Sequence, residues 1–396
     1  MIVQKYGGSS LATSEHIKAV AEHLKYVKEN IDNKLVVVVS AMGKTTNNLI
    51  ALSKEISNSP NLRDYDALVS TGENISASML SIALNEIGVK AISFNGFQVP
   101  IKVSGAYTKS YIENINTKKI IEKLDKDFIV IITGFQGVNE KGEIATLGRG
   151  GSDTTAVALA SALNCRCEIY TDVEHIFTCD PRILSNAKPI KKIAYEEMIE
   201  LALGGAKVLE PRSVEIGKKY GIPIYLGKSL ERNKEKGTFV MNRSLEHEHI
   251  SGLALKENIS AVSISLDKEK SEVAKKLLEL NKQELNNFDM LSITTSGNLK
   301  FISFLIEENK SESLLRSLEE KDLLKSLTSI EINSLSKITI AGLGFITHPN
   351  LTNDIISVVS KYNVFNLSMS EFALSITVEK MYSKEILEKL QNQFNL

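Results

Sequence analysis

The chain has 396 residues, of which 43% are hydrophobic, and its formal net charge is −1 at pH 7. This length and apolar content are typical of two or three domains with real cores. A charge near zero provides no basic field for nucleic acid or an anionic membrane, and no apolar run reaches transmembrane length. Three cysteines argue against a disulfide framework. We therefore expect a cytoplasmic protein without a signal peptide, a nucleic-acid partner or a membrane partner.

Strand and helix patterns alternate through residues 1–230, which indicates a mostly parallel sheet between layers of helices. Strands are expected at residues 2–5, 35–40, 91–94, 128–133, 168–171 and 222–226. Helices are expected at residues 14–30, 46–57, 75–87, 154–163, 195–203 and 211–220. In such a sheet the ligand site lies at the carboxyl ends of the strands.

The remainder of the chain changes character. Residues 231–250 are rich in charge and are expected to form a linker. His247 and His249 lie there without further metal ligands nearby in the sequence, so we expect them to belong to this surface linker rather than to a metal site. Beyond the linker, a strand–helix–strand–strand–helix pattern occurs twice, which indicates two ferredoxin-like modules at residues 251–330 and 331–396. Their strands are expected at residues 261–266, 301–306, 337–340 and 373–378. Their helices are expected at residues 272–280, 311–320, 351–361 and 384–393.

A glycine-rich run at residues 146–155 is the most informative stretch of the chain. Its three glycines let the backbone approach a ligand closely. Ser152 is a good N-cap for the following helix, whose N-terminus can hold an anion. Arg149 adds a guanidinium suited to a carboxylate or phosphate, and Asp153 adds one carboxylate. Together these residues predict an anion site rather than a simple turn.

Three further turns are informative, two of which follow predicted strands. Lys5 ends the first strand and precedes paired glycines and two hydroxyls, which is the outline of a phosphate cradle. Residues 43–45 imitate the end of a Walker A loop, but Val38 stands where that motif requires glycine, so we exclude a P-loop. Glu73 places a carboxylate just past the turn that follows Val69. Taken singly, each of these turns is also compatible with an ordinary strand end.

In combination and in this order, these runs resemble the motifs of the aspartate kinase family. Further similar runs lie at residues 168–173, 177–182 and 205–209. The resemblance is strong over residues 1–230, where it implies an amino acid kinase catalytic domain. It is looser over residues 251–396, which look like the paired ACT domains that end aspartate kinases. The implied fold is a three-layer αβα sandwich with a mostly parallel sheet, the amino acid kinase fold, followed by two ferredoxin-like ACT modules.

The resemblance implies ATP-dependent phosphorylation of the side-chain carboxylate of L-aspartate to 4-phospho-L-aspartate, the first step toward lysine, threonine and methionine. Lys5 and Asp153 are implied as the catalytic pair, and Mg²⁺ is implied as the companion of ATP, without a metal site made of protein ligands alone. The residues implied to bind the amino acid are Thr46, Glu73, Arg149, Gly150, Gly151 and Ser152. The residues implied to bind the nucleotide are Lys5, Gly7, Gly8, Ser9, Thr171, Asp172, Phe177, Asp180, Arg182 and Lys207.

The implied ACT modules predict feedback inhibition by lysine, with threonine as the alternative, and a homodimer or dimer of dimers formed through these modules. Two departures bear on the effector: residues 268–271 replace the Pro-Gly turn usual in the family, and Asn350 stands where glycine is common. Two other functions stay open. One is a related kinase that acts on glutamate, acetylglutamate, carbamate or a nucleoside monophosphate. The other is a catalytically silent, amino-acid-binding regulatory subunit.

Overall fold

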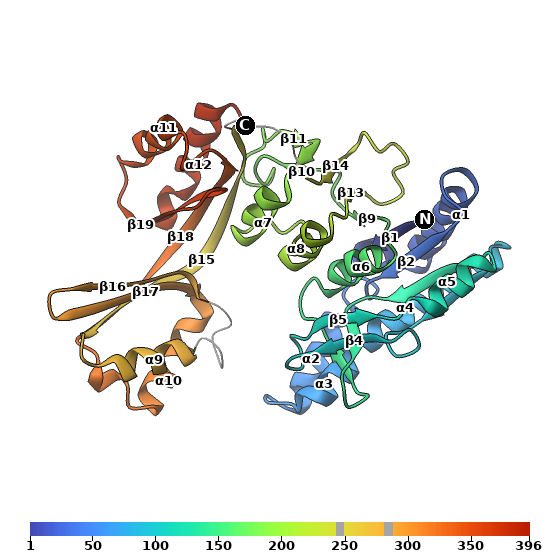
Figure 1. Ribbon diagram of the computed structural model, residues 1–396, viewed down its shortest axis with the longest axis horizontal. Coiled ribbons are helices and arrows are strands. Elements are labelled where there is room, and N and C mark those ends of the chain that lie inside the picture. Colours follow the sequence, from blue (N-terminus) through green and yellow to red (C-terminus); the bar gives the residue numbers. More distant parts are fainter. Residues whose placement is uncertain (243–248, 281–287) are drawn as a thin grey trace. The chain divides into compact units, whose positions relative to one another are not determined.

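The computed structural model describes residues 1–242, 249–280 and 288–396, and the chain divides into two compact units. Unit 1 comprises Met1–Thr178, Lys188–Leu203 and Lys207–Glu246. Unit 2 comprises Cys179–Ala187, Gly204–Ala206 and His247–Leu396. Each unit has its own main sheet (Figure 1). Each also has its own hydrophobic core.

Unit 1 is built on an eight-stranded sheet. In spatial order its strands are β12 (Lys192–Ile193), β14 (Gly237–Val240), β13 (Ile224–Lys228), β9 (Arg166–Thr171), β1 (Ile2–Tyr6), β2 (Leu35–Val39), β6 (Ile129–Thr133) and β3 (Ala91–Phe94). The pairs from β13 to β3 are parallel, whereas β14 runs antiparallel to β13. Every residue of β1, β2 and β6 is buried, as the continuous apolar runs predict for strands covered on both faces.

Helices cover both faces of this sheet. The helices of unit 1 are α1 (Ser14–Asn30), α2 (Thr45–Ile56), α3 (Leu62–Val69), α4 (Thr71–Glu86), α5 (Lys118–Asp125), α6 (Gly151–Ala162), α7 (Tyr195–Leu203) and α8 (Pro211–Tyr220). Leu24 of α1 and Leu80 of α4 share a core with Ile2 and Tyr6 of β1. Successive side chains in a strand alternate, so Lys5 points to the other face, where α6 contacts β1, β2 and β9. The predicted three-layer sandwich is confirmed.

A smaller four-stranded sheet in unit 1 did not emerge from the sequence. It consists, in spatial order, of β5 (Tyr111–Ile115), β4 (Ile101–Ser104), β7 (Gln136–Val138) and β8 (Ile144–Thr146). Helix α3, which was also not predicted, packs against β8. A two-stranded sheet of β10 (Ile176–Phe177) and β11 (Pro189–Ile190) completes the unit. Short strands and an eight-residue helix carry too few residues for their periodicity to be read.

Unit 2 is a six-stranded sheet packed against helices. In spatial order its strands are β16 (Asp289–Ser296), β17 (Leu299–Glu307), β15 (His249–Asp267), β18 (Ser329–Leu343), β20 (Ala373–Val378) and β19 (Val364–Met369), and its helices are α9 (Ser271–Leu280), α10 (Ser311–Glu320), α11 (Pro349–Val359) and α12 (Lys380–Phe394). All neighbouring strands are antiparallel. The arrangement is consistent with two ACT modules that share one continuous sheet.

The structure differs from the predicted borders in two places. Strand β14 pairs with β13 in the sheet of unit 1, so residues 237–240 belong to that sheet and not to a solvated linker, while His247 lies outside the described residues. Strand β15 serves both modules: Leu253 packs in the core with α11 and α12, whereas Val262 packs in the core with α9 and α10. A register shift between Lys256 and Ile259 separates the two halves. One long bulged strand therefore contributes to two cores, which a division into consecutive modules does not capture.

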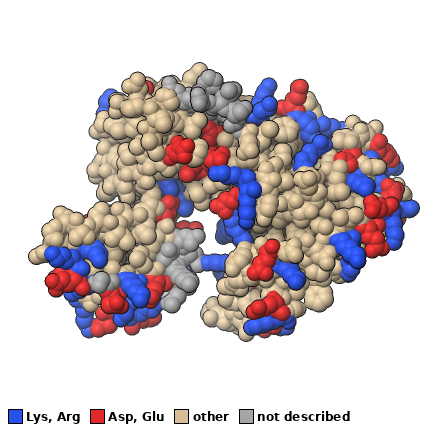
Figure 2. Space-filling view, viewed as in Figure 1, with Lys and Arg blue, Asp and Glu red and all other residues tan. Residues whose placement is uncertain are grey.

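The surface carries charges of both signs. Acidic and basic side chains are interspersed along the edge of unit 1 that carries α1 and α5 (Figure 2), as the near-zero net charge leads one to expect. None of the described helices combines the length and apolar character that crossing a membrane requires.

Candidate active site

The turns that follow the central strands of unit 1 enclose a cleft of about 840 Å³. Its walls come from the turns after β1 and β2, from α2, α3 and α4, and from the glycine-rich run before α6. The six residues predicted to bind the amino acid all line it: Thr46, Glu73, Arg149, Gly150, Gly151 and Ser152. These six residues come from three separate parts of the sequence, which the parallel topology brings to one edge of the sheet.

Lys5 and Asp153 form a buried ion pair. The distance from Lys5 Nζ to Asp153 Oδ1 is 2.6 Å, and the two side chains are only 10% and 12% exposed. Lys5 comes from β1 and Asp153 from the first turn of α6. Little water screens this pair, so the ammonium acts strongly on any charge that develops beside it. The structure thus brings these two residues into contact, and their catalytic role stays a prediction.

Glu73 is a buried carboxylate in the first turn of α4, with 4% of its surface exposed. Its Oε1 accepts a hydrogen bond of 3.1 Å from the backbone N–H of Ala41, while its buried Oε2 has no hydrogen-bond partner among the described residues. Burial raises the pKa of Glu73 to about 7, against the effect of the hydrogen bonds that it accepts. A buried carboxylate in a cleft, with one oxygen that lacks a hydrogen-bond partner, is suited to bind a cationic group of a ligand.

The glycine-rich run begins α6 differently from the prediction. Ser152 does not cap the helix: Gly150 is the N-cap, with a φ of 64°, and Ser152 lies inside the first turn. There its Oγ is 2.7 Å from the hydroxyl of Ser40. A Cβ on Gly150 would stand 2.6 Å from Oε2 of Glu210, so both the positive φ and the close approach require glycine. Arg149, next to Gly150, is exposed and makes no ion pair with the described residues.

The residues predicted for the phosphates also meet at strand ends. The N–H of Gly7 donates a hydrogen bond of 3.1 Å to the carbonyl of Tyr170, which places the turn containing Gly7, Gly8 and Ser9 beside Thr171 and Asp172. A Cβ on Gly8 would lie 2.8 Å from the carbonyl oxygen of Ala41. The hydroxyl of Thr171 donates to Asp172 Oδ1 at 2.8 Å.

Of the ten residues predicted for the nucleotide, Gly8 is the one that lines the cleft, and four others lie outside the strand-end turns described above. Phe177 lies in β10, where its ring contacts that of His175, and Lys207 is exposed in the segment before α8. Asp180 and Arg182 belong to unit 2 and pair with each other, with 2.6 Å between Arg182 Nη2 and Asp180 Oδ2. Their roles stay predictions.

The structure adds residues that the sequence analysis missed. Ser229 follows β13, donates its N–H to the carbonyl of Thr171 at 2.9 Å and pairs its hydroxyl with that of Ser10. Its place at the end of a predicted strand was a usable signal. Glu210 stands beside Gly150, and the nearby charge of Asp153 adds to the burial that raises the pKa of Glu210. No local pattern marks Glu210, since only the packing of α8 against α6 brings it there.

Comparison with known proteins gives concordant results. Residues 1–228 match the model of the amino acid kinase family. An aspartokinase of Geobacillus stearothermophilus is 39% identical over 403 residues, which cover 100% of this chain and 97% of the relative. The crystal structure of E. coli aspartokinase III in complex with aspartate and ADP, in the R-state, shares the fold with a TM-score of 0.84 at 24% identity over 100% of both chains. The T-state of that enzyme, in complex with lysine and aspartate, gives 0.76 at 24% identity over 100% of this chain and 99% of the other.

Proposed function

Since this chain belongs to the amino acid kinase family and, along its whole length, to the aspartokinases, we propose that it converts ATP and L-aspartate into ADP and 4-phospho-L-aspartate. The observation that carries this proposal is that two groups of opposite charge line one cleft in unit 1. One is the buried carboxylate of Glu73, whose Oε2 has no hydrogen-bond partner among the described residues, and the other is the exposed side chain of Arg149. An α-amino acid carries both a cationic ammonium and an anionic carboxylate, and Glu73 and Arg149 complement these two charges.

The reaction needs little covalent help from the protein. The side-chain carboxyl group of aspartate has a reference pKa of about 3.9, so it is ionised at neutral pH and needs no general base. Its oxygen attacks the γ-phosphorus, the bond to the bridging oxygen of ADP breaks, and ADP leaves with that electron pair. The main obstacle is the repulsion between two anions. Positioning and fixed positive charge therefore supply most of the catalysis.

Lys5 is the cation that we assign to the transferring phosphoryl group. Its ammonium lies at the end of β1, beside the turn of Gly7 and Gly8 that we assign to the phosphates. Asp153 holds this ammonium at 2.6 Å and thereby orients it. Thr171 and Ser229, which are hydrogen-bonded to each other at the ends of β9 and β13, are assigned to the remainder of the nucleotide.

The Mg²⁺ that accompanies ATP fits the carboxylates at the start of α6. Mg²⁺ is held in proteins through one or two carboxylates together with substrate phosphates, and Asp153 and Glu210 are two carboxylates near the N-terminus of that helix. No cluster of three or more His, Cys, Asp or Glu side chains with metal-binding geometry occurs within residues 1–242, 249–280 and 288–396, so the phosphates would complete the coordination. The ion supplies neutralisation of phosphate charge.

Substitution of Glu73 and of Arg149 tests the assignment of these two residues to the binding of aspartate. Glu73→Gln and Arg149→Lys are expected to raise the KM for aspartate about tenfold or more, because each removes a charge-assisted or bidentate hydrogen bond. The KM for ATP is expected to stay nearly unchanged. A rise in the KM for ATP alone would show that the two substrates had been assigned to the wrong parts of the site.

We further propose that unit 2 binds an amino acid that inhibits the kinase, with lysine as the effector and threonine as the alternative. The support is a second unit with two packed modules, together with the fold shared with the lysine-bound E. coli enzyme. An effector shifts activity only if it binds one conformation better than another. Inhibition curves and calorimetric titration of the full chain with lysine and with threonine test this proposal. Full activity at millimolar concentrations of both, with no heat of binding, would contradict it.

A further inference from the structure

Asp66, in α3, uses a fully buried carboxylate to join two segments that are distant in sequence. Its Oδ2 accepts hydrogen bonds from the backbone N–H of Thr108 at 2.8 Å and of Thr146 at 2.7 Å. Its Oδ1 accepts a third, of 2.8 Å, from the hydroxyl of Thr146. Thr108 has a φ of 67°, an uncommon conformation for a residue with a branched Cβ. The carboxylate of Asp66 therefore fixes both the turn between β4 and β5 and the end of β8.

Arg212, in α8, holds the next residue of the same segment. Its Nη1 donates to the carbonyl of Leu147 at 2.8 Å, and its Nη2 donates to the carbonyl of Ser110 at 3.0 Å. The N–H of Ser110 donates to the carbonyl of Thr146, and the N–H of Leu147 donates to the carbonyl of Phe135, both at 2.9 Å. Every backbone N–H and C=O group of Thr146 and Leu147 thus has a hydrogen-bond partner.

Arg149 lies two residues beyond Leu147, the last residue of this anchored segment, and between two glycines. Gly148 and Gly150 flank it with φ values of 79° and 64°. Glycine populates many backbone conformations, so the flanking residues alone do not determine where the guanidinium lies. A binding group must be held within about 0.5 Å of its productive position to be effective. The hydrogen bonds that Asp66 and Arg212 make with residues 146 and 147 fix the backbone that leads into this segment.

We propose that Asp66 and Arg212 are positioning residues that set where Arg149 presents its guanidinium to the carboxylate of the amino acid. This inference rests on the proposed function, in which Arg149 binds that carboxylate. Asp66 and Arg212 act from α3 and α8, on the backbone of the segment that leads to Arg149. Neither is required to touch a substrate.

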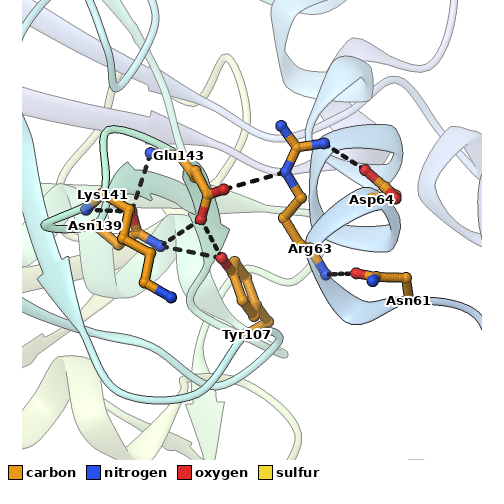
Figure 3. A network of polar contacts seen from close by, with 7 residues as sticks. All are labelled: Asn61, Arg63, Asp64, Tyr107, Asn139, Lys141 and Glu143. Atoms are coloured by element: carbon orange, nitrogen blue, oxygen red, sulfur yellow. Dashed lines mark hydrogen bonds and ion pairs between the residues drawn. The ribbon is translucent and has the colours of Figure 1, made fainter.

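A second polar network on α3 provides a contrast, because it connects Arg63 through Glu143 to Tyr107, the residue before Thr108 (Figure 3). Arg63 Nε donates to Glu143 Oε1 at 3.4 Å, and the hydroxyl of Tyr107 donates to the other oxygen of Glu143. Arg63 also pairs with Asp64, and these two side chains are 54% and 65% exposed. Exposed ion pairs contribute little, so the loss of this network is expected to leave Arg149 in place.

The test is the substitution Asp66→Asn, which keeps the size of the side chain but replaces an acceptor by an NH₂ group facing N–H donors. We expect the KM for aspartate to rise about tenfold, as for a misplaced charge-assisted hydrogen bond to the substrate. The KM for ATP and kcat are expected to change by less than about twofold. Asp64→Asn, two residues earlier on the same helix, is the matched control and is expected to change none of these values. A role in stability alone would lower the melting temperature without this separation of KM from kcat.

The same substitution in an Arg149→Ala background shows whether Asp66 acts through Arg149. If it does, Asp66→Asn adds no further increase in the KM for aspartate there. An undiminished increase in that background, or an unchanged KM in the single variant, would overturn the inference. If Asp66→Asn does not fold, Arg212→Lys replaces it in the test. Lysine cannot donate to the carbonyls of Leu147 and Ser110 with the two nitrogens of one planar group, so the same rise in the KM for aspartate is expected.

Hydrogen exchange separates a failure of this inference from a failure of the proposed function. If Arg149→Ala leaves the KM for aspartate unchanged, the proposed role of Arg149 fails. The anchoring is then tested by the backbone amide of Thr146, which is expected to exchange faster in Asp66→Asn than in Asp64→Asn. Equal exchange rates in the two variants would refute the anchoring itself.

Discussion

The buried carboxylate of Glu73 predicts how aspartate binding depends on pH. Its pKa lies at about 7 because of burial. The protonated form cannot pair with the ammonium of the substrate, so the competent fraction of the enzyme is the ionised fraction. That fraction is about one tenth at pH 6 and about nine tenths at pH 8, and the apparent affinity scales with it. We therefore predict that kcat/KM for aspartate rises about tenfold from pH 6 to pH 8.

The assay is ADP release at saturating MgATP, with kcat/KM for aspartate measured at intervals across this range. The profile of kcat/KM reports the pKa of the free enzyme, so the midpoint is expected near pH 7. Glu73→Gln, which keeps the acceptor for the Ala41 N–H but cannot ionise, is expected to be much less active toward aspartate and flat with pH. A flat profile in the wild type, or the same inflection in Glu73→Gln, would refute the reasoning.

The remaining predictions concern charge in unit 1. Lys5→Ala is expected to lower kcat by roughly 10²–10⁴-fold while nucleotide binding weakens far less, because the ammonium acts mainly on the transferring group; turnover within about threefold of wild type would remove Lys5 from this role. Lys234→Ala removes an ammonium 2.9 Å from Glu168 Oε2, whose side chain is 3% exposed. The Lys234 side chain is 29% exposed, and Gln4, Tyr170 and Arg166 also contact Glu168. We therefore expect this change to lower the free energy of unfolding by about 1.5–3 kcal/mol, the range for a hydrogen bond to a charged group. Urea denaturation measures this loss, and a value below about 1 kcal/mol would contradict it.

Long, strongly patterned elements were predictable because their signals are local. The apolar runs at 35–39 and 129–132 predict the buried strands β2 and β6, and the apolar periodicity of residues 14–30 predicts α1. Glu73 lies in the first turn of α4 and Arg149 in the turn before α6, and the parallel topology brings both to one edge of the sheet.

The supporting contacts of the cleft were not predictable, because they depend on tertiary packing. Asp66 lies in an eight-residue helix, and its partners Thr108 and Thr146 are 42 and 80 residues away. Ser152 has the side chain of a good N-cap, but a left-handed conformation at Gly150 begins the helix earlier and leaves Ser152 to pair with Ser40. Residue type indicates what a side chain can bond, and only the fold decides what lies within reach.

The central claim is tested most directly by measuring ADP release over a panel of acceptors, with hydroxylamine present to trap acyl phosphates. The panel contains L-aspartate, glutamate, acetylglutamate, carbamate and a nucleoside monophosphate. The account predicts ATP-dependent turnover with L-aspartate, formation of the corresponding hydroxamate, and loss of both in Lys5→Ala. Turnover with another acceptor and none with L-aspartate, or no turnover with any of them, would contradict it.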